Sequence, residues 1–287
     1  MTAYLDQNRI RRAFNRAAAC FDERDFLNHE IRQRLADRLE LIAIEPKTIL
    51  DLGASTGDAA AALQVRYPSA QIAGIDSALQ MLRLRSQNAT GTASLCADAG
   101  ALPLRNASVD LVFSNLMFPF CADPMRVFAE VRRVLKHPGA MLFSSLGPDT
   151  LIELQQAWRE VDDYHHVLPF MDMHDLGDAI VNAGFAEPVL DTEVLTITYR
   201  DLRRGLDDLR DAGSINASVG RNPGLTGKDA WRRMTAAYEK NRADDGRLPV
   251  TIELVYGVAW AGAGYGREPG DGDVEIPVEQ ILRRTRF

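Results

Sequence analysis

Cysteine is scarce in this chain, long apolar runs are missing, and positive charge is not in excess. The three cysteines, Cys20, Cys96 and Cys121, are far apart and form no C-x-x-C pair, so we expect no disulfide framework and a reducing compartment. No apolar run approaches the length of a membrane span, and the N-terminus lacks a signal-peptide core. The formal net charge of −7 argues against a general nucleic-acid binder. Together these features predict a cytoplasmic protein that binds neither membranes nor nucleic acids.

Clusters of metal ligands and activated nucleophiles are missing as well. His165 and His166 are adjacent, and His174 has no Cys or Glu close by in sequence that would complete a ligand set. The chain contains no Gly-x-Ser-x-Gly motif, which marks the nucleophile of many hydrolases. We therefore expect no bound metal ion and no hydrolase-type nucleophile.

The pattern that is present is an alternation of strands and helices. The 287 residues, 46% of them hydrophobic, suffice for one large domain or a domain with an insertion. From Pro46 onward, short apolar runs alternate with helical segments, and such repeated units predict a parallel sheet covered by helices on both faces. The predicted strands are 48–52, 71–76, 93–96, 109–114 and 140–146, and the predicted helices between them are 58–66, 77–87 and 124–136.

Further helices and strands are predicted on either side of this α/β core. Residues 8–43, 148–161 and 172–183 have helical periodicity, whereas residues 188–199 and 250–260 predict two more strands. We therefore predict an inserted helical lid between these two strands. The predicted division is an N-terminal helical segment (1–45), a core (46–199 and 248–262), the lid (200–247) and a partly flexible C-terminal tail (263–287).

The stretch Thr48–Gly57, with the sequence TILDLGASTG, predicts a strand, a tight turn and a helix N-terminus. Gly53 allows the backbone to turn sharply, and Gly57 allows the helix to begin close to a ligand. The next predicted strand also ends in an acid, Asp76, which is well placed to accept hydrogen bonds from a ribose. These features predict a nucleotide-type cofactor site at the carboxyl ends of the strands.

Two kinds of cofactor compete for such a site. A dinucleotide requires the Gly-x-Gly-x-x-Gly pattern, whereas this turn has only Gly53 and Gly57, with Ser55 between them. The looser turn favours S-adenosylmethionine, and the segment resembles motif I of class I methyltransferases, although Ala54 and Ser55 replace the usual Cys and Gly. The expected contacts lie at or just beyond strand ends: Asp51, Gly53, Ser55, Gly57, Asp76, Ser77, Asp98, Ala99 and Asn115.

The chemistry expected at this site needs little acid–base assistance. The methyl group of a sulfonium is already activated, so alignment and exclusion of water dominate methyl transfer. A carboxylate acceptor is ionised at neutral pH and needs no general base. The absence of an obvious acid–base pair therefore fits carboxylate methylation. An arginine of the lid is a natural partner for such an acceptor.

Several stretches spread over nearly the whole chain resemble the BioC family of malonyl-[acyl-carrier-protein] O-methyltransferases. These are Arg12–Phe14, Leu146–Leu151, Asp172–Asp178, Gly213–Arg221 and Arg247–Thr251. The resemblance implies a Rossmann-like class I methyltransferase with a seven-stranded sheet, and S-adenosylmethionine as the methyl donor. It implies esterification of the free carboxylate of malonyl-acyl carrier protein, or of malonyl-CoA, early in biotin biosynthesis.

The resemblance also implies contacts with the acceptor. His166 and Arg221 match the lid positions expected to touch the substrate. The arginines between Arg9 and Arg16 form a basic helix suited to an acidic carrier protein. One departure lies beside the transfer pocket, where Asn115–Phe120 replaces a segment that usually ends in Gln-Trp.

A second likeness leaves an alternative open. Residues 25–38 and 191–260 also look like the mitochondrial complex I assembly factor that hydroxylates an arginine. On this alternative, the protein is an arginine hydroxylase or a non-catalytic protein that binds S-adenosylmethionine.

Overall fold

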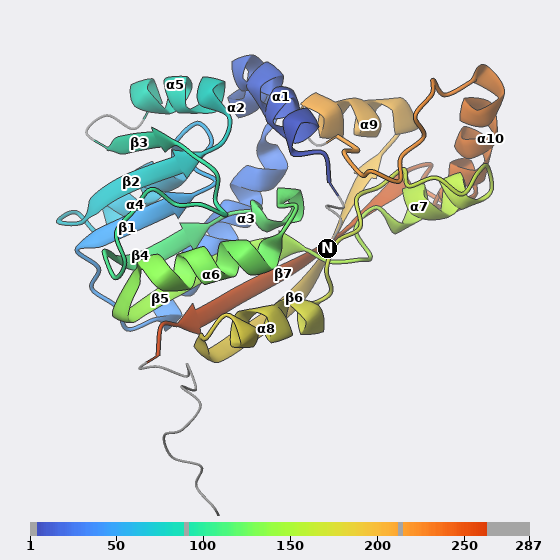
Figure 1. Ribbon diagram of the computed structural model, residues 1–287. Helices are drawn as coiled ribbons and strands as arrows, with labels where there is room; N and C mark the ends of the chain where they lie inside the picture. Colours follow the sequence, from blue (N-terminus) through green and yellow to red (C-terminus); the bar gives the residue numbers. More distant parts are fainter. Residues whose placement is uncertain (1–4, 89–91, 212–214, 263–287) are drawn as a thin grey trace, which may run out of the picture.

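The computed structural model describes residues 5–88, 92–211 and 215–262 (Figure 1). The predicted tail, 263–287, lies outside the described residues. Seven strands form one sheet in the order β3-β2-β1-β4-β5-β7-β6. Their bounds are β1 (Thr48–Leu52), β2 (Gln71–Asp76), β3 (Ala93–Cys96), β4 (Val109–Ser114), β5 (Leu135–Leu146), β6 (Ala186–Tyr199) and β7 (Leu248–Trp260).

The pairing of the strands separates a parallel part of the sheet from an antiparallel part. Strands β1 to β5 are paired in parallel, with Leu50 opposite both Ala73 and Val112. Strand β7 runs antiparallel to both of its neighbours, β5 and β6. The carboxyl ends of the parallel strands therefore share one edge of the sheet, where ligands bind in folds of this kind.

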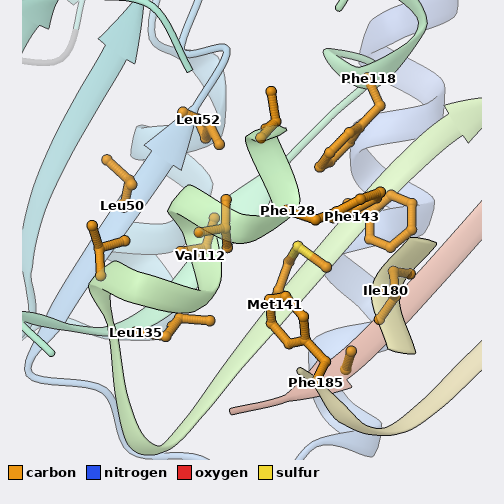
Figure 2. Close-up of a cluster of buried hydrophobic side chains, with 14 of the residues drawn as sticks. Leu50, Leu52, Val112, Phe118, Phe128, Leu135, Met141, Phe143, Ile180 and Phe185 are labelled. Carbon is orange, nitrogen blue, oxygen red and sulfur yellow. The ribbon is translucent and has the colours of Figure 1, made fainter. Parts of the chain in front are cut away.

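Two hydrophobic clusters cover the two faces of the sheet. On one face, α6 (Pro124–Val134) and α8 (Met173–Asn182) pack on a cluster that includes Phe128, Met141 and Phe143 (Figure 2). On the other face, α3 (Phe26–Asp37) and α4 (Asp58–Arg66) cover a cluster that includes Ile31 and Leu63. The expected cover of helices on both faces is thus confirmed.

The N-terminal segment is helical but broken. Helix α1 (Gln7–Ala17) begins at Asp6, whose carboxylate accepts a hydrogen bond from the Arg9 amide. It is followed by a short 3₁₀ turn, by α2 (Phe21–Arg24) and by α3. The break falls at Asp25, which has φ −88° and ψ 31°.

The boundary predicted between helix 124–136 and strand 140–146 is wrong. Helix α6 ends at Val134, and β5 begins at Leu135, which is extended and pairs with Val109 of β4. Local sequence favours a longer helix here. Burial of Leu135 in the sheet, where it is 2% exposed, overrides that preference.

The helix predicted at 148–161 is shorter, because Leu151 has a left-handed φ of 59° and α7 spans Ile152–Arg159. The predicted helix at 77–87 is α5 (Leu79–Asn88). In the segment between β6 and β7 lie α9 (Leu202–Asp211) and α10 (Lys228–Tyr238), which pack with α7 in a separate small cluster. None of the helices in the described ranges is long and apolar enough to cross a membrane.

Candidate active site

A cavity of about 640 Å³ lies at the carboxyl ends of the parallel strands. Its floor includes Leu52 at the end of β1, Ile75 of β2 and Leu116 after β4. Its roof includes Gln7 of α1 and Leu209 of α9, two helices that lie side by side above the sheet edge in Figure 1. The volume is typical of a site for a small ligand or cofactor.

The predicted turn after β1 has the strained geometry that its glycines suggest. Gly53 has φ +79°, and a Cβ at this position would lie 2.6 Å from the Cβ of Met117. Ser55 is also left-handed, with φ 45°. Its hydroxyl faces the sulfur of Met81 at 3.8 Å, so its side chain leaves the cavity open. Gly57, with φ +105°, precedes α4 and is not part of the cavity wall.

Asp76 lines the cavity at the end of β2, as the sequence predicts. Its Oδ2 accepts a hydrogen bond from the Ser55 amide at 3.0 Å, and its Oδ1 accepts one from the Ala78 amide at 2.7 Å. Burial raises the pKa of Asp76, while these two backbone donors oppose the increase. The carboxylate therefore ties the turn after β1 to the start of α5, and it stands where a ribose can reach it.

Asp51 has a partner that the sequence analysis missed. Arg85 of α5 is fully buried, and its Nη1 donates a hydrogen bond to Asp51 Oδ2 at 2.8 Å. Burial raises the pKa of Asp51, and Arg85 opposes this increase. A Cβ at Gly74 would lie 2.3 Å from Arg85 Nε, so β2 leaves room for the guanidinium only because residue 74 is glycine. The Asp51–Arg85 pair therefore stabilises the turn after β1.

The remaining predicted cofactor residues also line the cavity: Ser77, Asp98, Ala99 and Asn115. Asp98 follows β3 and accepts a hydrogen bond from the Gly100 amide at 2.8 Å. Asn115 follows β4, and its Nδ2 donates a hydrogen bond to the Asn28 carbonyl of α3 at 3.1 Å. The predicted set thus extends from the β3 side of the cavity to the β4 side.

The two residues predicted to contact the acceptor are placed differently. His166 lines the cavity; its ring stacks on Trp158 at 3.6 Å, and its Nε2 lies 2.8 Å from Asp162 Oδ1. Arg221 is not part of the cavity wall. Its Nη1 donates a hydrogen bond to the Ser218 carbonyl at 2.9 Å, and its Nη2 lies 3.7 Å from Asp6 Oδ2. Of these two residues, only His166 lines the cavity.

The roof joins two distant parts of the chain. Leu5 and Ser218 form an antiparallel bridge, and the Asp6 amide donates a hydrogen bond to the Ala217 carbonyl at 2.9 Å. Arg9 Nε donates one to the Asn216 carbonyl at 3.1 Å. The start of α1 is therefore fastened to the segment between β6 and β7.

Beneath this roof the cavity is apolar. Phe14 of α1 meets Phe120 edge to face, with ring centroids 5.0 Å apart, and both line the cavity together with Leu168 and Phe170. An apolar, roofed region beside the polar side chains at the strand ends, such as Asp76 and Asp98, suits a reaction that requires exclusion of water. Among the described residues, no group of three or more His, Cys, Asp or Glu side chains could hold a metal ion.

Comparison with known proteins adds family information to this geometry. Residues 50–143 match the family described as "Methyltransferase domain". The malonyl-[acyl-carrier protein] O-methyltransferase of Laribacter hongkongensis is 44% identical over 95% of both chains. That of Gallionella capsiferriformans is 45% identical over 89% of this chain and 91% of the relative.

Among solved structures, the YcgJ protein from Bacillus subtilis superposes with a TM-score of 0.58 at 17% identity, covering 82% of this chain and all of that one. The [4+2]-cyclase SpnF superposes with a TM-score of 0.53 at 17% identity, covering 82% of this chain and 81% of that one. At such low identity these likenesses concern the fold alone, and the different name of the cyclase illustrates that fold does not fix reaction.

Proposed function

The chain belongs to the family of malonyl-[acyl-carrier protein] O-methyltransferases, and we propose that it methylates the free carboxylate of a malonyl group on acyl carrier protein. S-adenosylmethionine is the methyl donor. The observation that carries the proposal is the similarity over nearly the full chain, together with a roofed cavity at the end of a methyltransferase sheet. The relatives named above do not favour the alternative of an assembly factor. Esterification of this malonyl group belongs to biotin biosynthesis.

The residues around the cavity fit the donor. Asp76 offers a carboxylate to the ribose, and Gly53 keeps the turn after β1 free of a side chain. Asp98 stands at the β3 side, where the adenine amine needs an acceptor. We therefore propose that the predicted cofactor set contacts S-adenosylmethionine directly, except for Gly57, which is outside the cavity wall, and Asp51, which is buried and paired with Arg85.

Methyl transfer uses these residues for alignment. The sulfonium supplies an electrophilic methyl carbon; a carboxylate oxygen forms the new O–C bond as the S–C bond breaks, which yields a neutral methyl ester and S-adenosylhomocysteine. The chain needs no base, because the acceptor is already ionised. The roof, with Phe14 and Phe120, excludes water from the reacting atoms. His166, held by Asp162 and Trp158, is the residue we propose for contact with the acceptor.

The proposal is tested by incubating the protein with malonyl-acyl carrier protein and S-adenosylmethionine. We expect a mass increase of one methyl group on the malonyl carrier. Unmodified carrier and acetyl carrier are the controls and should remain unchanged. A protein that binds S-adenosylhomocysteine but forms no ester on the malonyl carrier would contradict the proposal.

We further propose that the carrier protein docks on α1. Four arginines, Arg9, Arg11, Arg12 and Arg16, are exposed on this helix, which contains no acid. Arg11 also lines the cavity, so the basic face borders its opening. An acidic carrier bound here would bring its attached malonyl group to the roofed site. A cytoplasmic location, which the three separated free cysteines favour, suits such a partner.

Reversing the charge of α1 should weaken this docking. We expect the Arg12→Glu, Arg16→Glu double variant to raise the KM for malonyl-acyl carrier protein about tenfold, because two favourable charges become repulsive. The KM for malonyl-CoA should change much less. Arg66→Glu, at an exposed position of α4, is the control and should leave both KM values near those of the unaltered protein. If the double variant raised the KM for malonyl-acyl carrier protein and the KM for malonyl-CoA equally, the carrier protein would not dock on α1.

A further inference from the structure

The amino-acid end of the cofactor requires partners that the predicted set does not supply. S-adenosylmethionine carries an ammonium and a carboxylate on its methionine end. If Asp98, after β3, binds the adenine and Asp76, at the end of β2, binds the ribose, the methionine end extends over β1 towards β4, because the strand order is β3-β2-β1-β4. Asp51 lies in that direction, but it is already paired with Arg85.

Arg32 of α3 is the cation on this side of the cavity. Arg32 lines the cavity and is 8% exposed. Its Nη2 donates a hydrogen bond to Asp58 Oδ2 of α4 at 2.8 Å and lies 2.6 Å from His29 Nδ1. Within the described part of the chain, no hydrogen bond occupies its Nη1 or Nε. The two other guanidinium groups of the wall, those of Arg11 and Arg126, are on exposed residues.

Asp25 stands beside Arg32 as the matching anion. It lines the cavity and is 7% exposed, and its Oδ2 lies 3.9 Å from Arg32 Nη1. This separation is too long for a hydrogen bond, so each group retains capacity for a ligand. Asn28, which donates a hydrogen bond to Asp25 through its side chain, is joined to Asn115 after β4 through its carbonyl. The pair therefore lies on the β1–β4 side of the cavity.

We propose that Arg32 binds the carboxylate of the methionine end of the cofactor and that Asp25 binds its ammonium. The inference rests on the proposed use of S-adenosylmethionine. Asp25, which immediately precedes α3, and Arg32, which lies on α3, are neighbouring charges of opposite sign that match the two charges of an amino-acid group. A malonyl carboxylate could use Arg32 alone, but it would leave Asp25 as an unfavourable neighbour of like charge.

The ionisation of Asp25 gives the proposal a signature in pH. Burial raises the pKa of Asp25 to about 7, whereas Asn28 and Arg32 of α3 oppose the increase. Asp58 of α4 and Asp22 of α2 raise it further. The ammonium of the ligand binds the ionised carboxylate of Asp25. The affinity for S-adenosylhomocysteine should therefore be highest above the pKa of Asp25 and should decrease below it. From about pH 8 to about pH 6 we expect affinity for S-adenosylhomocysteine to fall by up to about tenfold.

Calorimetry with two ligands separates this site from the rest of the cavity. S-adenosylhomocysteine has the amino-acid end, whereas 5′-methylthioadenosine keeps the nucleoside and lacks that end. We expect Arg32→Met to weaken binding of S-adenosylhomocysteine about tenfold or more and to leave methylthioadenosine nearly unchanged. Asp25→Asn should flatten the pH dependence of S-adenosylhomocysteine binding. Arg34→Met, on the same helix but paired with Glu30 and Glu193, is the matched control and should alter neither ligand.

The outcomes distinguish this inference from the proposed function. Failure of the unaltered protein to bind S-adenosylhomocysteine would contradict the use of this cofactor altogether. Normal binding by the unaltered protein, with equal losses for both ligands in Arg32→Met, would overturn the assignment of the amino-acid end. The assignment would also be overturned if Arg32→Met left the affinity for S-adenosylhomocysteine unchanged and raised the KM for malonyl-CoA. Arg32 would then bind the methyl acceptor.

Discussion

The Arg85→Met variant is expected to lose about 3–5 kcal/mol of its free energy of unfolding, because it leaves Asp51 buried without a counter-charge. Asp51 is 1% exposed, and its Oδ2 accepts a hydrogen bond from Arg85 Nη1. Methionine roughly fills the space of the arginine stem, so most of the loss should come from the unpaired carboxylate. Urea denaturation followed by circular dichroism measures the effect.

The loss should depend on pH in a defined direction. In the variant, Arg85 no longer opposes the effect of burial on Asp51, so the folded-state pKa of this carboxyl lies well above its unfolded-state value. A carboxyl group of this kind destabilises the fold once the pH exceeds the unfolded-state pKa, and the full cost is reached above the folded-state pKa. The variant should therefore be closer to the unaltered protein at about pH 5 than at about pH 8.

The control for this variant replaces both partners. Asp51→Asn, Arg85→Met removes both charges together and should recover much of the lost stability, because a buried pair is often exchanged for neutral groups at little cost. A double variant no more stable than Arg85→Met would show that packing, rather than the isolated charge, determines the loss.

The Asp76→Ala variant is expected to bind S-adenosylhomocysteine about 100-fold more weakly. The carboxylate stands at the cavity wall, and its replacement would remove the proposed charge-assisted hydrogen bonding to the ribose. Two such bonds at the lower limit of about 1.5 kcal/mol each correspond to about 100-fold in affinity. The replacement also releases the amides of Ser55 and Ala78, so the turn after β1 loses an anchor. Calorimetry at a temperature at which the variant remains folded measures the affinity.

A comparison of ligands makes the result specific. Methylthioadenosine should lose affinity to the same extent as S-adenosylhomocysteine, because both contain the ribose; this is the opposite of the selective loss expected for Arg32→Met. Asp98→Asn is the control at the β3 side of the cavity. It should lower the affinity for S-adenosylhomocysteine only a few-fold, because the amide oxygen of asparagine still accepts a hydrogen bond. If Asp76→Ala kept its full affinity for S-adenosylhomocysteine, the ribose would not bind at the end of β2.

Much of the fold follows from local patterns. The apolar runs at 48–52 and 109–114 coincide with β1 and β4, because strands buried on both faces need continuous hydrophobic sequence. The runs at 71–76 and 93–96 coincide with β2 and with β3, the exposed edge strand. The boundary at Leu135 could not be read locally, because it depends on pairing with Val109, which is distant in sequence. Secondary structure is thus least predictable where a long-range contact overrides helix propensity.

The candidate site was only partly predictable, for a related reason. Acids at strand ends, such as Asp76 and Asp98, can be recognised because parallel strands bring their carboxyl ends to one edge. Arg85 and Arg32 lie on helices, where an arginine ordinarily indicates a solvated face. Their burial depends on how α5 and α3 pack on the sheet, and on the space left at Gly74. No pattern within a single helix contains that information.

The position of β7 has a consequence for how the protein is made. Although β7 follows β6 in the chain, it lies between β5 and β6 in the sheet and pairs with both. A nascent chain leaving the ribosome therefore holds β5 and β6 apart, each with an unpaired edge, until residues 248–260 emerge. The segment that fastens to the start of α1 at Leu5 and Ser218 is also synthesised late. The sheet can be completed only after residues 248–260 have been synthesised, and the roof can be secured only after Ser218 has been synthesised.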